Sequence, residues 1–297
     1  MVENTKQFKS TFAQDNKLIL FIKKNIFVFN IAKNANSSIK NAISNSGNQY
    51  ADVITRFNYE PLIKLDGGNR RMRPSKLHFG NLSWIELERH FPTAFKKLSG
   101  YESFVIIRDP MERFISACCQ HILHVNKGSI ASLSDLDVER TIYNVIEHLN
   151  AHGDNCEELT VFKRQTDYVY NENKNVKTNN LFLIENITEF YEQLLVKTGC
   201  KASHHEIINQ NHIQNRFYEW TKGYRLSRLL PAPLKQRAKD LLVAHYGLKN
   251  KHRSTFSLPI VEDFVREYYS DDLACFTELK LKNDHDRDVV PGYHTIS

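Results

Sequence analysis

The sequence predicts an α/β fold with a central parallel sheet flanked by helices. Short apolar runs rich in β-branched and aromatic residues alternate with longer stretches that have apolar residues at helical spacing. Each apolar run reaches polar residues at its C-terminal end. Strands that alternate with helices are joined by right-handed crossovers and therefore pair in parallel. No repeat or long shift in composition divides the chain, so we expect a single domain over residues 1–297.

The expected strands are short and apolar enough to be covered on both faces. They are residues 26–31, 103–107 and 181–184. The expected helices show apolar residues at helical spacing, and two of them begin at clear capping residues. They are residues 37–46, 83–98, 110–124, 134–151, 187–198, 232–246 and 259–269.

Composition and charge narrow the class of protein. The chain has 297 residues, of which 41% are hydrophobic and 11% aromatic, enough to bury a large core. The formal net charge of +6 is small and dispersed, which argues against a protein that binds duplex nucleic acid. A modest positive excess instead favours a small anionic ligand.

The cysteines and the apolar N-terminal run indicate a cytoplasmic protein without a transmembrane segment. The five cysteines show no paired spacing, as expected in a reducing compartment. The run "KLILFIKKNIFVFNIA" is interrupted by Lys23 and Lys24, so it is too short to span a bilayer and has no signal-peptide pattern.

The first candidate site follows the strand at 26–31, in the stretch "FVFNIAKNANSSIK". Ser37 or Ser38 is suited to cap a helix that ends before Gly47. A helix N-terminus offers unpaired N–H groups to a phosphate or sulfate, and Lys33 adds a full positive charge. The alternative is an ordinary capped helix with a solvated lysine.

The second candidate site follows the strand at 103–107, in "YESFVIIRDPMERFISACC". Asp109 and Glu112 fall at the N-cap and N3 positions of a capping box. Arg108 then lies at the strand tip, and Ser116 lies about two turns along the helix, roughly 10 Å by helical rise. Both could contact a second anion. The alternative is that Arg108 pairs with Asp109 or Glu112 and that Ser116 is buried.

These two segments together resemble the nucleotide motifs of sulfotransferases that use 3′-phosphoadenosine 5′-phosphosulfate, in the branch of the carbohydrate O-sulfotransferases. "AKNANSSIK" is similar to the family's P-K-x-A/G-x-T/S-S motif, and "FVIIRDPMERFISA" is similar to its F-V-R-D/N-P-x-x-R-x-x-S motif. The resemblance implies a P-loop-like sulfotransferase fold and this nucleotide as sulfonyl donor. It implies that the 5′-phosphosulfate is bound by Lys33, Asn34, Ala35, Asn36, Ser37 and Ser38, and the 3′-phosphate by Arg108 and Ser116.

Weaker similarity extends the resemblance to about residues 26–276. "FKRQTDYVY" and "LFLIENI" resemble later family segments, which places Gln165 and Glu185 among the substrate-binding residues. "FVREYYSDDLACF" resembles the closing Y-x-x-D-x-x-x-F signature. Departures include Val161 and Arg164, where the family has His and Pro. Residues 200–257 match little and are where we expect the acceptor to be specified.

The proposed chemistry needs a cation at the leaving phosphate and a base at the acceptor hydroxyl. Lys33 suits the first role, and His78 in "SKLHFGNLS" suits the second, because histidine accepts a proton near neutral pH. Arg71 and Arg73 precede this histidine and could bind an acidic sugar. The alternative for His78 is a packing role. The expected acceptor is a hydroxyl-bearing glycan, glycolipid or small molecule.

Two other classes of protein fit parts of the sequence. A P-loop kinase would use a strand such as "FVIIRD" to hold magnesium, but the loop at Lys33 lacks the glycines and the Lys-Ser/Thr pair of a Walker A motif. A non-catalytic polyanion-binding protein would use the basic stretch "NRRMRPSK". We expect no metal ion, because "SHHEIINQNH" fits no common zinc spacing.

Overall fold

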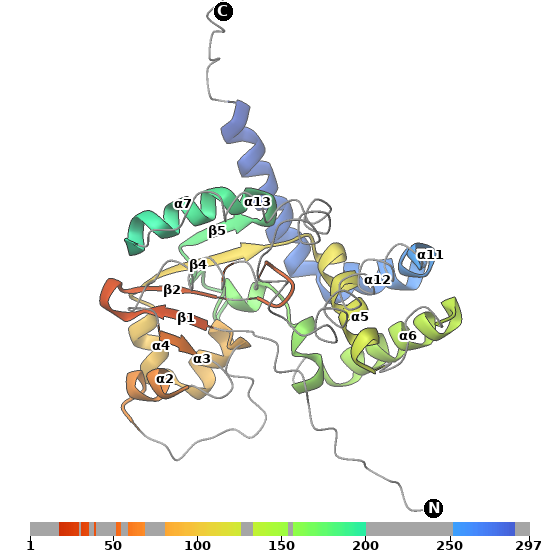
Figure 1. Cartoon of the computed structure of the whole chain (residues 1–297), viewed down its shortest axis with the longest axis horizontal. Helices are drawn as coiled ribbons and strands as arrows, with labels where there is room; N and C mark the ends of the chain where they lie inside the picture. Colours follow the sequence, from red (N-terminus) through yellow and green to blue (C-terminus); the bar gives the residue numbers. More distant parts are fainter. Residues whose placement is uncertain are drawn as a thin grey trace, which may run out of the picture.

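The computed structural model describes most of the expected elements (Figure 1). The described residues are 18–29, 31–35, 39, 52–54, 59–68, 81–125, 133–153, 157–199 and 252–288. The expected helix at 232–246 lies outside them, as does the expected helix at 37–46 except for Ile39, which is helical.

The described part of the chain contains a five-stranded mixed sheet in the order β3-β1-β2-β4-β5. Its parallel part is the predicted one: β2 (Ile26–Val28), β4 (Glu102–Ile107) and β5 (Asn180–Leu183) run side by side. The α/β fold class with parallel central strands is therefore confirmed. Two strands were not predicted, β1 (Leu18–Phe21) and β3 (Asp52–Ile54), and both pairings of β1 are antiparallel.

The lysine pair that interrupts the N-terminal apolar run forms the turn of a hairpin. Lys23 and Lys24 lie in the short 3₁₀ helix η1 (Ile22–Lys24), and Asn25 follows with a left-handed φ of 52°. Asparagine adopts this conformation more readily than most residues. The run thus folds back on itself, and Phe21 pairs with Ile26.

Side-chain alternation along the strands divides the core between the two faces of the sheet. Phe27 and Phe29 face one side, where they pack with α2 (Glu60–Leu65), α3 (Trp84–His90) and α4 (Pro92–Leu98). Ile26 and Val28 face the other side, against α7 (Ile187–Thr198). Figure 1 shows these helices as layers on opposite faces of the sheet. This double coverage explains why the strands are apolar throughout.

A third apolar cluster lies among helices beside the sheet. It joins α5 (Pro110–Val125), α6 (Asp135–His152), the 3₁₀ helix η4 (Glu157–Phe162), α11 (Arg253–Phe256) and α12 (Pro259–Tyr268). The last described helix is α13 (Ser270–Asp288), which packs Cys275 into the core under the sheet. None of the helices in the described ranges is both long and apolar enough to cross a membrane.

Two helix predictions need correction. The predicted helix at 83–98 is two helices, because proline cannot continue a helix and Pro92 starts α4 instead. The N-terminus of α4 is capped from elsewhere in the chain, since Asp66 accepts hydrogen bonds from Thr93 N and Ala94 N at 3.1 and 3.0 Å. The chain after 269 was not predicted to be helical, although α13 spans 19 residues.

Candidate active site

The turn after β2 carries Lys33 at the carboxyl end of the parallel strands. It closes with a hydrogen bond from Asn34 N to Ile31 O, and the helical Ile39 N donates to Ala35 O, both at 3.1 Å. Lys33 and Ala35 have left-handed φ values of 72° and 63°. Such conformations cost of order 1–3 kcal/mol each for residues other than glycine, and they direct backbone N–H groups into concavities that bind anions.

Asn34 fixes this turn against the neighbouring strand. Its side chain is buried, and Nδ2 donates to Ile106 O at 2.7 Å and to Gln165 Oε1 at 2.6 Å. Among the residues that the structure describes, its Oδ1 has no hydrogen-bond partner. The turn is therefore anchored to β4 and to the segment between η4 and the 3₁₀ helix η5 (Thr166–Tyr168).

Gln165 connects the ends of β2 and β4. Besides its bond from Asn34, its Oε1 accepts from Arg108 N at 2.9 Å, and its Nε2 donates to Arg108 O at 2.8 Å. One buried amide thus satisfies both backbone groups of Arg108, just beyond β4. We call Lys33, Asn34, Arg108 and Gln165 the strand-tip cluster.

Asp272, on α13, holds Gln165 in place. Its carboxylate accepts hydrogen bonds from Gln165 N at 2.8 Å and from Thr166 N and Oγ1 at 2.9 and 2.8 Å. Its Oδ2 also lies 3.7 Å from Arg113 Nη2, and both side chains are almost fully buried, with 0% and 1% exposed. The guanidinium of Arg113 lies over the ring of Tyr269, 5.2 Å from its centroid.

The strand-tip cluster holds two cations close together. Arg108 Nη1 donates to Lys33 O at 3.1 Å, and Arg108 Nη2 lies 3.5 Å from the half-exposed carboxylate of Glu112. Burial lowers the pKa of Lys33 to about 8, the thiol of Cys119 opposes this shift, and the positive charge of Arg108 adds to it. Burial also lowers the pKa of Arg108, while Glu112 raises it.

Two partly desolvated cations beside a turn with left-handed residues form a site suited to an anion. Positive charge that is held out of water attracts an anionic ligand more strongly than solvated charge does. Around the cluster and throughout the described ranges, no group of three or more His, Cys, Asp or Glu could hold a metal ion. The arrangement suits binding and transfer of a phosphate- or sulfate-like group.

The structure brings together some of the predicted site residues. Lys33, Asn34, Ala35, Arg108 and Gln165 lie at the two strand tips. Six other predicted residues lie outside the described residues: Asn36, Ser37, Ser38, Arg71, Arg73 and His78.

Three predicted site residues differ in their exposure to solvent, and so in whether a ligand could contact them. Ser116 is partly exposed on α5. Glu185 is exposed, in the 3₁₀ helix η6 (Ile184–Asn186) that follows β5, and its charge raises the pKa of Arg108. Gln165, predicted to bind substrate, is buried and its amide is used by Asn34 and Arg108.

Sequence reasoning assigned no role to Asp272, Arg113 or Thr166. A signal for Asp272 was present in "YYSDDLACF", where Tyr269 and Asp272 are spaced to share a helix face. The structure shows both side chains bound to the η4–η5 segment, because Tyr269 Oη donates to Phe162 O at 2.7 Å. The local sequence pattern does not show that Tyr269 and Asp272 bind to the η4–η5 segment.

Comparison with known proteins gives one match. The model of a family described as "Sulfotransferase family" matches residues 16–214, about two thirds of the 297-residue chain. The match includes the whole strand-tip cluster and ends before Asp272. Searches of curated proteins and of solved structures gave no significant match.

Replacement of Asp272 by asparagine should destabilise the protein strongly. Asp272→Asn keeps the shape but leaves Arg113 without its ion pair and turns one acceptor into a donor that faces N–H groups. Breaking a buried ion pair in this way costs about 3–5 kcal/mol. Thermal and urea denaturation would measure the loss.

The adjacent Asp271 provides a matched control. It is half exposed and pairs with Lys174. Asp271→Asn should change the free energy of unfolding by less than about 1 kcal/mol, as is usual for surface pairs. Equal losses in the two variants would contradict the role given to Asp272.

Proposed function

Because the chain belongs to the sulfotransferase family and is an O-sulfotransferase, we propose that it takes the sulfonyl group from 3′-phosphoadenosine 5′-phosphosulfate and transfers it to a carbohydrate or glycolipid hydroxyl. The observation that supports this donor most directly is the pair of cations in the strand-tip cluster. Lys33 and Arg108 come from the tips of adjacent parallel strands, where α/β sheets bind their ligands.

The residues of the strand-tip cluster fit a ligand that carries more than one anionic group. The turn at Lys33 would bind the phosphosulfate, and Arg108 the 3′-phosphate. The guanidinium of Arg108 has five N–H donors, of which Nη1 uses one on Lys33 O, so others remain for a ligand. The donor supplies a sulfonyl group that is already bonded to a good leaving phosphate.

Lys33 would stabilise the negative charge that develops on that phosphate. With a pKa of about 8, its amine is mostly protonated at neutral pH. A partly desolvated ammonium that is already in place needs little reorganisation during the reaction, which is how preorganised charge lowers a barrier. As in phosphoryl transfer, the protein would act mainly by positioning and electrostatics.

We further propose His78 as the base and the cytoplasm as the location. His78 precedes the segment Asn81–Ser83, which leads into α3 beside the η4–η5 segment. Arg71 and Arg73 are proposed to bind an acidic sugar of the acceptor. Cys118 and Cys275 are buried free thiols, as is usual for proteins of a reducing compartment.

The donor assignment predicts a clear preference among nucleotides. The protein should bind 3′-phosphoadenosine 5′-phosphate much more tightly than AMP or ATP, because only the former has anions for both Lys33 and Arg108. At about 100 times its dissociation constant the ligand should stabilise the fold by roughly 2.7 kcal/mol, visible as a thermal shift. Transfer of labelled sulfur to acceptors from the source cells would test the reaction itself. An equal shift with ATP and magnesium would contradict the assignment.

The lowered pKa of Lys33 predicts proton uptake when the nucleotide binds. An anion beside the amine raises its pKa from about 8 toward its ordinary value, so at pH 8 a half-protonated amine becomes protonated. Calorimetry in buffers of different ionisation enthalpy should detect proton uptake by the protein at pH 8, above the second pKa of the nucleotide's phosphates, which is about 6.

Lys33→Met is the control for that measurement. The variant should bind more weakly and show no uptake at pH 8, because the group that titrates is gone. The same uptake in the variant would assign the proton to another residue.

The assignment of His78 predicts a loss of turnover without a loss of binding. His78→Asn should lower the single-turnover rate by about a hundred-fold or more, with nucleotide affinity and melting temperature unchanged. The wild-type rate should rise with pH through an ionisation near 6.5, and this limb should be missing in the variant. A joint fall in stability and activity would indicate a packing role instead.

A further inference from the structure

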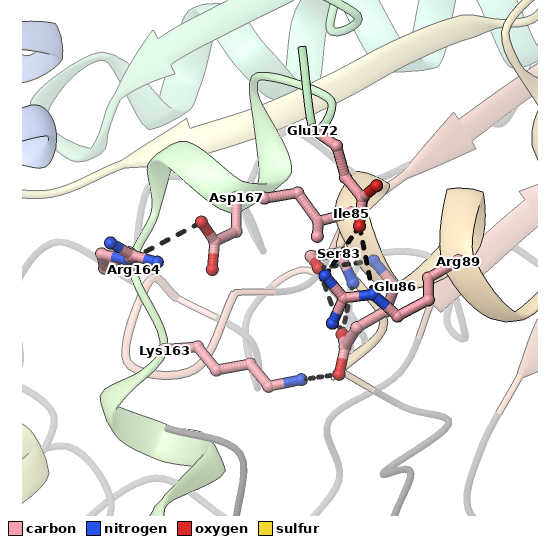
Figure 2. Close-up of a pocket in the computed structure, with 8 residues that line it drawn as sticks. All are labelled: Ser83, Ile85, Glu86, Arg89, Lys163, Arg164, Asp167 and Glu172. Carbon is pink, nitrogen blue, oxygen red and sulfur yellow. Dashed lines mark hydrogen bonds and ion pairs between the residues drawn. The ribbon is translucent and has the colours of Figure 1, made fainter. Parts of the chain in front are cut away.

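A pocket of about 430 Å³ lies between α3 and the segment 163–172 (Figure 2). This volume is within the range of small-molecule sites, about 300–1,000 Å³. Apart from Ser83 and Ile85, every residue that lines it is charged. The charged residues are Glu86, Arg89, Lys163, Arg164, Asp167 and Glu172.

The charges in this pocket form three pairs of opposite sign. Lys163 Nζ contacts Glu86 Oε1, and Figure 2 shows the two side chains meeting end to end. Arg89 Nη2 lies 2.7 Å from Glu172 Oε1. Arg164 Nε lies 3.8 Å from Asp167 Oδ1. With three cations and three carboxylates, the lining carries no net charge.

The innermost pair is held rigidly. The second carboxylate oxygen of Glu86 accepts from Ser83 N and Oγ, at 2.9 and 3.2 Å, in the capping box that starts α3. Lys163 is buried and also donates to Asn81 O at 3.3 Å. Neither group can turn toward a ligand without breaking these contacts, so the floor of the pocket is preorganised.

A pocket of this kind suits an uncharged ligand with many hydroxyls. A carboxylate ligand would bring a fourth negative charge to a lining in which each of the three cations is already paired with a carboxylate, so it would gain little net attraction for the hydration that it loses. A sugar hydroxyl both donates and accepts, so it can bond to a carboxylate oxygen and to a cationic N–H while the pairs stay intact. Ile85 adds an apolar surface for the C–H groups of a sugar ring.

The pocket and the strand-tip cluster share one short segment of the chain. Lys163 lines the pocket, and Gln165, two residues further along, belongs to the strand-tip cluster. A ligand in the pocket and a donor at the cluster would therefore use side chains of the same segment.

From this geometry we infer that the pocket binds an uncharged sugar residue of the acceptor, and discriminates against a uronic acid at that position. The inference rests on the proposed function, which identifies the ligand as an acceptor. The three charge pairs would determine specificity, because an uncharged sugar can bind while all three pairs stay intact.

The test is binding of methyl glycosides in the absence of donor, measured by saturation-transfer difference NMR with titration. The panel contains the neutral glycosides of glucose, galactose, mannose, xylose and N-acetylglucosamine, and the uronides of glucose and galactose. At least one neutral glycoside should bind the wild-type protein at least about tenfold more tightly than either uronide. No binding by any neutral glycoside, or a preference for uronides, would overturn the inference.

Glu172→Gln locates the binding in this pocket. It leaves the charge of Arg89 uncompensated, so it should strengthen uronide binding about tenfold. The double variant Arg89→Gln/Glu172→Gln restores neutrality and should lose that gain. Glu278→Gln is the matched control, because Glu278 forms a similar exposed pair at 2.7 Å with Lys282 on α13, and it should change nothing. An unchanged preference in Glu172→Gln would place the sugar elsewhere.

These measurements separate the inference from the proposed function. Glycoside binding needs neither nucleotide nor transfer. If neutral glycosides bind as described but labelled sulfur is not transferred from the donor, the sugar specificity of the pocket stands and the proposed reaction fails. If transfer occurs but only uronides bind, the proposed function stands and the inference fails.

Discussion

The side-chain amide of Gln165 bonds both to the turn after β2 and to the chain that leaves β4, and it adds to the direct bonds from Asn34 to Ile106 O and from Arg108 to Lys33 O. Beyond the last pairing of β4, the N–H and C=O of Arg108 no longer have partners in the sheet, and Gln165 supplies both. Without it they would lack these partners, at a cost of about 1–3 kcal/mol for each buried group. The same amide accepts from Asn34, so the turn that carries Lys33 and the loop that carries Arg108 depend on one group, itself held by Asp272.

These hydrogen bonds hold the strand-tip cluster in a conformation that would be unfavourable for the isolated segments. Two cations are brought together out of water, and two residues of the Lys33 turn adopt left-handed conformations. Both features are unfavourable without an anion, and the surrounding hydrogen bonds hold them in place. The neighbouring pocket is the opposite case, since its cations are already compensated by carboxylates. On our proposals, an anionic donor and an uncharged acceptor would meet along the short segment from Lys163 to Gln165.

Local patterns predicted most of the fold and failed where distant contacts decide it. The strands at β2, β4 and β5 and the helices α5, α6, α7 and α12 lie where the apolar periodicity placed them, because burial on one or both faces sets that periodicity. The pattern missed β1, whose partner is the next strand across a lysine-containing turn. The periodicity also merged α3 and α4 into one helix. Pro92 in the sequence indicated a break between them, but the capping of α4 by Asp66 could not be read from the sequence.

For the site, the sequence by itself determined the chemistry, and the tertiary structure determined the geometry. The Lys33 turn, the capped helix after Arg108 and the resemblance to sulfotransferases are local features, readable because caps and turns depend on residues a few positions apart. The bonds from Asn34 and Asp272 to Gln165 join residues 131 and 107 positions apart. Only the order of strands in the sheet and the packing of α13 bring those residues together. No short-range pattern encodes such contacts. The partners of a buried carboxylate or amide are the polar groups that the folded chain places around it.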